Sequence, residues 1–169
     1  MRTYDLRTAQ LFTEDIVHPI TNFSLSNTDK GSSIATSCLD GIIRLYDTTQ
    51  QQQMKKKVFQ KLHSSHRSNN YKVECTFTSN DKYVVSGSEC GNVAIYPVDL
   101  NNRTTDIGAS SKVVKEKEEA TILHKHTGPT TSVAACPQTK RPWLVVSASY
   151  DGSAVVWASQ AQYVCCLLD

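Results

Sequence analysis

The chain has 169 residues, of which 39% are hydrophobic, which is enough to build a core of ordinary size. Lys and Arg number 18 against 16 Asp and Glu, so the net charge of +2 creates no strong field toward nucleic acids or anionic membranes. No apolar run approaches the roughly 18 residues of a membrane span and no signal-peptide core follows Met1, so we expect a cytoplasmic and nuclear protein without direct nucleic-acid or membrane binding.

In chain order, residues 1–6 and 11–16 are predicted to be two short strands, and a pattern that occurs three times follows them. Each copy has an apolar strand, a polar turn, a strand ending in small hydroxyl residues, an acidic or glycine turn, and a strand that closes on an aromatic residue. The copies cover residues 19–47, 71–97 and 131–157. Because β-branched and aromatic residues predominate and Gly stands at the last turn of each copy, we expect antiparallel strands and an all-β fold.

The three copies keep one register. The last turn is centred on Asp40, Cys90 and Asp151. Four residues before these positions stand Thr36, Ser86 and Ser147, and six residues after them stand Tyr46, Tyr96 and Trp157. This constancy of spacing indicates an internal structural repeat.

These residues resemble the WD-repeat family, whose blades each contain four antiparallel strands around a central axis. The resemblance implies a partial β-propeller with about three complete four-stranded blades plus half of a preceding blade. It divides the chain into the last two strands of a preceding blade (1–17), a blade (18–65), a blade with a long insertion at 101–119 (66–125) and a C-terminal blade (126–169). Since a ring usually has roughly four to eight blades, we expect a truncated gene model, a fragment, or a protein that closes through missing blades or another chain.

The resemblance also implies a structural hydrogen-bond network in each blade, made by a His before the first strand, a Ser or Thr, the turn Asp and a Trp. The third copy has all four, as His126, Ser147, Asp151 and Trp157. The carboxylate can orient the imidazole, the imidazole can bond the hydroxyl, and the hydroxyl can accept the indole N–H, so that every buried polar group has a partner.

The other two copies depart from this pattern. The second has His66, Ser86 and Tyr96. Its Cys90 replaces the acid, so we expect the imidazole to lose its charged partner. The first has Thr36, Asp40 and Tyr46. We leave His18 out of the network because it lies only two residues before the first strand, against seven in the other copies.

Catalytic and metal-binding alternatives have weaker support. His63 with His66, and His124 with His126, could suggest a metal site, but no acidic or thiol ligand stands at supporting spacing. Ser147, His126 and Asp151 could be arranged as a hydrolytic triad, but no Gly-x-Ser-x-Gly elbow accompanies them. The six cysteines are scattered, which favours small buried hydrophobes over disulfides, and the lysines at 55–57 suit a solvated loop better than a nucleic-acid patch. We therefore predict neither an enzyme nor a cofactor.

Residues 4–12, 19–21 and 66–75 resemble the later blades of one group of WD-repeat scaffolds. That resemblance implies a non-catalytic protein-interaction scaffold whose partners are kinase-cascade or spliceosomal components. The alternative is a propeller fragment that serves another assembly, either a ubiquitin-ligase substrate adaptor or a ribosome-biogenesis complex. Composition and spacing do not identify the binding face.

Overall fold

The structure, a computed structural model, describes residues 2–13, 18–28, 31–48, 58–63, 66–99, 120–138 and 143–158. Within these ranges the chain forms strands and turns without a helix, so no helix there could cross a membrane. The strands form antiparallel sheets in which sequence neighbours pair. This confirms the all-β expectation and is consistent with part of a WD-repeat propeller.

An N-terminal hairpin precedes three larger sheets. It pairs β1 (Arg2–Asp5) with β2 (Gln10–Thr13). Sheet I contains β3 (Ile20–Leu25), β4 (Ser33–Cys38), β5 (Ile43–Asp47) and β6 (Val58–Leu62). Sheet II contains β7 (Cys75–Phe77), β8 (Tyr83–Ser86), β9 (Asn92–Pro97) and β10 (Thr121–His124). Sheet III contains β11 (Thr130–Ala135), β12 (Val145–Ser149) and β13 (Ala154–Trp157).

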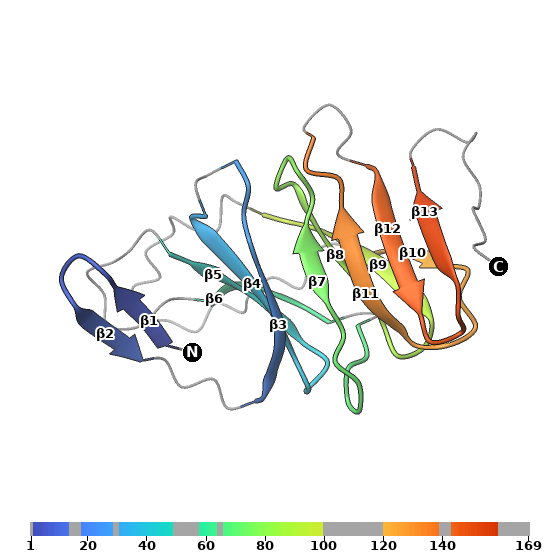
Figure 1. Ribbon diagram of the computed structural model, residues 1–169, viewed down its shortest axis with the longest axis horizontal. Helices are drawn as coiled ribbons and strands as arrows, with labels where there is room; N and C mark the ends of the chain where they lie inside the picture. The colour runs from blue at the N-terminus through green and yellow to red at the C-terminus, as the bar shows by residue number, and fades with distance from the viewer. Residues whose placement is uncertain are drawn as a thin grey trace.

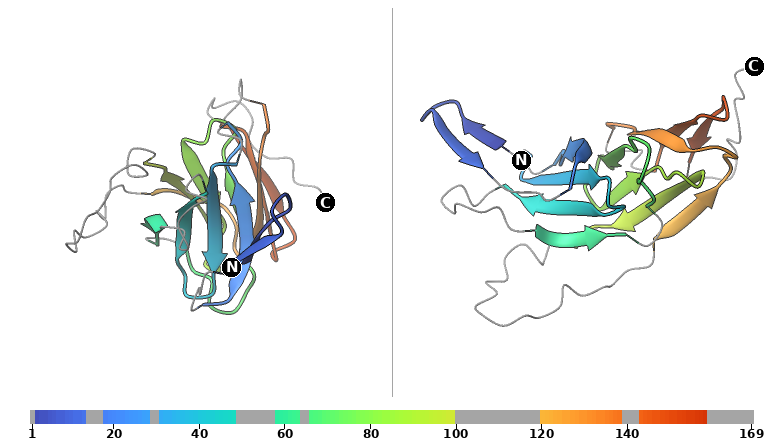
Figure 2. Two further views of the ribbon diagram at one scale, coloured as in Figure 1. Left: turned by 90° about the vertical axis from the view of Figure 1, so that its left-hand side faces the viewer. Right: turned by 90° about the horizontal axis from the view of Figure 1, so that it is seen from below.

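The sheets stand in a row in sequence order, with the β1–β2 hairpin and β13 at opposite ends (Figures 1 and 2). The first strand of each sheet contacts the first strand of the next, β3 against β7 and β7 against β11. Each new sheet therefore begins beside the first strand of the previous one. The residues expected to form the long insertion at 101–119, the loop at 50–57 and any fourth strand after β13 lie outside the described ranges. The blade boundaries at 18, 66 and 126 stay predictions.

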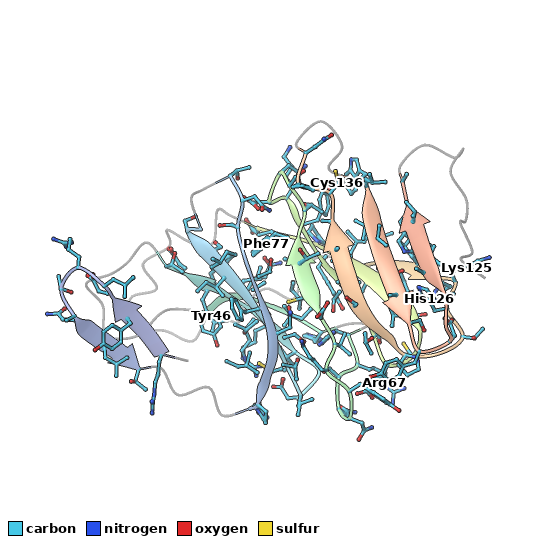
Figure 3. The ribbon with its side chains drawn as sticks, in the orientation of Figure 1. Tyr46, Arg67, Phe77, Lys125, His126 and Cys136 are labelled. Carbon is cyan, nitrogen blue, oxygen red and sulfur yellow. The ribbon has the colours of Figure 1, made fainter. Side chains whose placement is uncertain are left out.

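The hydrophobic core lies between the sheets and follows from the alternation of side chains along each strand. In β8, Val84 packs in a cluster with sheet I residues such as Leu45, whereas the next residue, Val85, packs in a cluster with Val133 of sheet III. Figure 3 draws the side chains as sticks, with Phe77 labelled where sheets I and II meet. A one-residue change of register would exchange the two faces of sheet II, so the apolar pattern fixes the pairing.

Polar contacts and a glycine bring the sheets close together. The buried carboxylate of Asp81, in the β7–β8 turn, accepts hydrogen bonds from the backbone N–H groups of Asn27 and Thr28 in the β3–β4 turn. Gly87 lies so close to sheet III that a Cβ atom built on it would stand 2.1 Å from the carbonyl oxygen of Thr130. Neighbouring sheets are therefore joined by specific contacts as well as by apolar packing.

Residues 71–74 were predicted as the beginning of a strand, and this prediction was wrong, because β7 begins only at Cys75. The side chain of Glu89 accepts hydrogen bonds from the backbone N–H groups of residues 69, 70 and 71. These bonds hold residues 69–71 as a loop, and the N–H of Glu74 donates to the carbonyl oxygen of Thr131 in sheet III.

Candidate functional site

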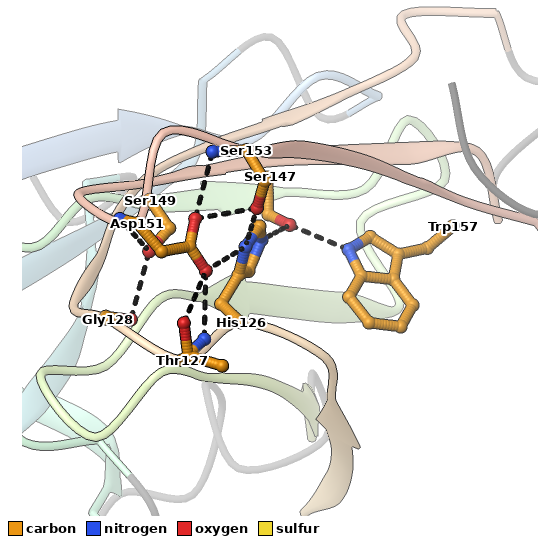
Figure 4. A network of polar contacts seen from close by, with 8 residues as sticks. All are labelled: His126, Thr127, Gly128, Ser147, Ser149, Asp151, Ser153 and Trp157. Carbon is orange, nitrogen blue, oxygen red and sulfur yellow. Dashed lines mark hydrogen bonds and ion pairs between the residues drawn. The ribbon is translucent and has the colours of Figure 1, made fainter. Parts of the chain in front are cut away.

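The four residues predicted to form a network in the third copy meet at the end of sheet III (Figure 4). His126 Nε2 lies 2.8 Å from Ser147 Oγ, and Trp157 Nε1 donates to the same hydroxyl at 2.8 Å. His126 Nδ1 lies 3.4 Å from Asp151 Oδ2. A fifth residue that the sequence did not indicate, Ser153, stands between them, with its Oγ 2.8 Å from Nδ1 and 2.6 Å from Asp151 Oδ1.

The donor and acceptor capacities of these side chains fix the direction of each hydrogen bond in the network. Trp157 can only donate, and the ionised Asp151 can only accept. The Ser153 hydroxyl donates to Asp151, so it must accept the Nδ1–H of His126. In a neutral imidazole Nε2 then accepts from the Ser147 hydroxyl, which itself accepts from Trp157. Each group in this series donates a hydrogen bond to the next, from the indole to the carboxylate. In such an arrangement the bonds polarise one another.

Asp151 also closes the turn that follows β12. Its carboxylate accepts the backbone N–H of Thr127 at 2.8 Å and that of Ser153 at 2.9 Å. The hydroxyl of Ser153, with the N–H of Thr127, holds the pKa of Asp151 well below its usual value. The carboxylate is therefore charged at neutral pH and joins the segment before β11 to the β12–β13 turn.

His66 is held differently, because Cys90 supplies no carboxylate. Its Nδ1 lies 2.8 Å from Ser86 Oγ in sheet II, and its Nε2 lies 3.2 Å from Ser37 Oγ in sheet I. In the described part of the chain its hydrogen-bond partners are hydroxyl and carbonyl oxygens. Burial lowers the pKa of His66, which favours the neutral ring. This histidine thus bridges two sheets, whereas His126 bonds within sheet III.

The acid of the first copy has a partner that the sequence analysis missed. Asp40 accepts a two-pronged hydrogen bond from Arg44, four residues later on β5. Burial alone would raise the pKa of Asp40, but Arg44 outweighs it, and the pKa lies below the usual value. His18, which the sequence analysis left out, lies 3.5 Å from the same carboxylate with 46% of its side chain exposed.

The remaining predicted network residues lie inside the sheets. Tyr46 and Tyr96 are both buried, at 4% and 2% exposure. Thr36 is fully buried, and its hydroxyl donates to the carbonyl oxygen of Arg44 at 3.4 Å. In the first copy, therefore, the acid bonds an arginine side chain and the threonine hydroxyl bonds a backbone carbonyl.

The geometry also bears on the catalytic and metal alternatives. Ser147 has no exposed surface, so a substrate cannot reach its hydroxyl without opening the sheet. β10 ends at His124, whose Nδ1 lies 2.7 Å from Asn92 Oδ1, while His126 follows in the loop and turns into sheet III. The two rings thus have separate partners, and the described residues include no group of three or more His, Cys, Asp or Glu side chains suited to hold a metal ion.

Two aromatic pairs lie at opposite ends of the sheets and connect sheet II, or the loop before it, to sheet III. Tyr71 and Tyr150 meet edge to face with ring centroids 5.4 Å apart, and they are 39% and 67% exposed. Tyr83 and Trp143 meet at 4.5 Å at the other end. Tyr71 is fixed by its N–H bond to Glu89, and the N–H of Tyr150 donates to the carbonyl of Pro129. The Tyr71–Tyr150 pair is therefore an exposed apolar surface on a fixed backbone beside the His126 network.

The segment that carries this network matches a known family model. The model of the family described as WD domain, G-beta repeat, matches residues 117–158, which include all five network residues. Residues 117–158 are thus similar to a WD repeat. The chain is also 27% identical over 114 residues to the WD repeat domain-containing protein 83 homolog of Dictyostelium discoideum, a match over 68% of this chain and 33% of that protein. It is 33% identical over 90 residues to human WD repeat domain-containing protein 83, a match over 53% of this chain and 26% of the relative.

The resemblance to WD-repeat proteins inferred from the residue pattern is thereby confirmed. The matched part of the chain spans about a third or less of the length of each curated relative. What those whole proteins do therefore bears on this chain only as a proposal.

Proposed function

We propose that this WD-repeat chain is a non-catalytic protein-interaction scaffold of the kinase-cascade and splicing type. The observation that carries the proposal is the His126 network. Its residues, which could otherwise be mistaken for a hydrolytic triad, are used in hydrogen bonds that fix a turn within the segment matching the WD repeat. Similarity to WD repeat domain-containing protein 83 supports a WD-repeat scaffold. The resemblance of residues 4–12, 19–21 and 66–75 to one group of such scaffolds implies kinase-cascade or spliceosomal components as partners.

The Tyr71–Tyr150 pair is the proposed contact surface. Exposed aromatic side chains on a fixed backbone bury a large apolar area and lose little entropy when a partner binds, which is why tyrosine is frequent among the residues that dominate protein interfaces. The pair lies beside the turn that Asp151 fixes, so the network positions this surface. A scaffold of this type acts in the cytoplasm and the nucleus, which imaging of a fluorescently tagged chain tests directly.

Affinity purification of the tagged chain from cell extract, followed by mass spectrometry, tests the partners. We expect kinase-cascade or spliceosomal components, and we expect Tyr150→Ala to reduce their recovery several-fold. Trp143→Ala is the matched control, because Trp143 belongs to the aromatic pair at the opposite end of the sheets. A preparation dominated by ubiquitin-ligase or preribosomal subunits would instead support the other assemblies, and recovery of none of these proteins would refute the scaffold proposal.

A further inference from the structure

The loop before β7 is held by an acid that stands one residue before the turn position of the repeat. Cys90 occupies that turn position in sheet II, and Glu89 precedes it. One carboxylate oxygen of Glu89 accepts the backbone N–H groups of residues 69–71, and the N–H of Glu89 donates to the carbonyl oxygen of Arg67 at 3.0 Å. Glu89 thus joins this loop to the β8–β9 turn, which is the role that Asp151 has in sheet III.

Acidic side chains near the Tyr71–Tyr150 pair are already bonded within the protein. Burial alone would raise the pKa of Glu89, but the three N–H groups outweigh it, and the pKa lies below its usual value. Asp151 accepts two backbone N–H groups and a serine hydroxyl. Glu74 lies 3.5 Å from the ammonium group of Lys72 and accepts a hydroxyl from β11. These three carboxylates therefore have their donors inside the chain.

Two cations at the same end of the sheets have no such partner. Arg67 belongs to the loop of Tyr71, and Lys125 directly precedes His126. Figure 3 labels Arg67 below β11, on the side where His126 lies. Both cations are exposed, and in the described part of the chain neither lies within ion-pair distance of an acidic side chain. A guanidinium or an ammonium group can donate hydrogen bonds but cannot accept them, so both remain free donors.

The two tyrosines add apolar ring surface and two more donors. Neither phenol hydroxyl bonds another residue among those that the structure describes, so each can donate to a partner. Backbone acceptors beside the rings are occupied, because Ser68 donates to the carbonyl oxygen of Tyr71 and Tyr150 donates to that of Pro129. The surface thus combines apolar rings with free donors, while these neighbouring acceptors are taken.

We propose that this surface binds an acidic peptide segment of a partner protein, with an apolar side chain on the Tyr71–Tyr150 pair and carboxylates on Arg67 and Lys125. The inference rests on the proposed scaffold function and names the chemistry of its partner. Carboxylates supply the acceptors that these donors lack, and hydrogen bonds between ionised groups are about twice as strong as neutral ones. A basic segment would find the neighbouring carboxylates already bonded and would meet two like charges, so complementary charge selects an acidic partner.

Selection from a random peptide library displayed on phage, with the full 169-residue chain as the target, tests the proposal. We expect the selected peptides to carry aspartate or glutamate on both sides of a large apolar residue. Fluorescence anisotropy with the strongest selected peptide then measures its Kd, which should rise with ionic strength because the contact is between charges at the surface. Selected peptides that are neutral or basic, or a selection that yields no binding peptide, would overturn the proposal.

Charge reversal in the chain locates the contact. Arg67→Glu and Lys125→Glu should each weaken binding of the selected peptide at least about threefold, because each replaces an attraction by a repulsion. Lys82→Glu is the matched control, since Lys82 is exposed beside Tyr83 of the aromatic pair at the opposite end, and its Kd should not change. If circular dichroism shows that Arg67→Glu misfolds through repulsion from Glu89, Lys125→Glu decides the question. Unchanged binding by the folded variants would refute the site.

The Tyr150→Ala chain separates failure of this inference from failure of the proposed function. Selected peptides that need the Tyr150 ring but carry no acidic residue would support the contact surface and refute the acidic partner. Acidic peptides that bind Tyr150→Ala as tightly as the unchanged chain would refute this site, whichever proteins affinity purification recovers. Single-stranded RNA offers phosphates and bases instead, so poly(U) should not displace the peptide; displacement would indicate a nucleic-acid surface and overturn the proposal.

Discussion

Replacing Ser147 with alanine tests whether the His126 network stabilises sheet III. The hydroxyl has no exposed surface and lies 2.8 Å from both His126 Nε2 and Trp157 Nε1. The substitution removes one oxygen and leaves both nitrogens without that partner. A buried polar group that loses its partner costs about 1–3 kcal/mol. Because Trp157 is only half-buried, water can replace part of its bond, and we expect a total loss of about 2–4 kcal/mol in the free energy of unfolding.

Urea unfolding followed by tryptophan fluorescence measures this loss. Ser132→Ala is the control, since it removes an exposed hydroxyl that donates to Glu74 at 2.6 Å, and such a bond should contribute less than about 1 kcal/mol. The Ser147→Ala/Trp157→Phe double variant also lacks the indole donor. Its loss of unfolding free energy should therefore be smaller than the sum of the losses of the two single variants. A Ser147→Ala loss no larger than that of Ser132→Ala would refute the reasoning.

Three further predictions concern pH, close packing and thiol reactivity. The pKa of His66 is lowered by burial, so below about pH 6.5 the unfolded chain binds more protons than the folded one; stability should fall as the pH drops through that value, and His66→Gln should remove this dependence in unfolding measured between pH 5 and 8. Gly87→Ala should destabilise the protein by more than about 2 kcal/mol in the same urea assay, because its methyl group would overlap the Thr130 carbonyl, whereas Gly31→Ala, with open space around it and strain from its φ of +75° alone, should cost less. Burial raises the pKa of Cys75 to about 12, so a thiol reagent with peptide mapping should label the exposed Cys90 quickly and Cys75 only on unfolding; equal rates would contradict the burial.

Residue spacing predicted most of the strands, and the resemblance to the WD-repeat family supplied the last network, because both depend on positions within one repeat. His126, Ser147, Asp151 and Trp157 belong to a single hairpin and the segment before it, so a constant offset brings them together. Ser37 could not be found in this way. It belongs to sheet I and meets His66 only because the two sheets pack together, and no offset within the second repeat includes it.

Arg44 and Ser153 were missed for a related reason. Arg44 reaches Asp40 across a turn, and its residue type occurs at this position in the first repeat alone, so comparison of the repeats did not single it out. Ser153 stands two residues after Asp151, where many side chains are compatible with a turn. Its role depends on where its hydroxyl lies in space, 2.8 Å from His126 Nδ1 and 2.6 Å from Asp151 Oδ1. Local spacing does not encode that position.

The replacement of an acid by Cys90 has a consequence for how the sheets cooperate. His66 bonds Ser37 of sheet I and Ser86 of sheet II, so it couples two sheets, whereas the His126 network lies within sheet III. A double-mutant cycle of Ser37→Ala with His66→Gln should therefore give a coupling free energy of about 0.5–1.5 kcal/mol, although the residues lie in different sheets. The cycle of Ser147→Ala with His66→Gln should be additive within about 0.5 kcal/mol, because the two networks share no partner. Equal coupling free energies in both cycles would show that the coupling does not come from the contact between Ser37 and His66. In that case His66 does not bridge the sheets.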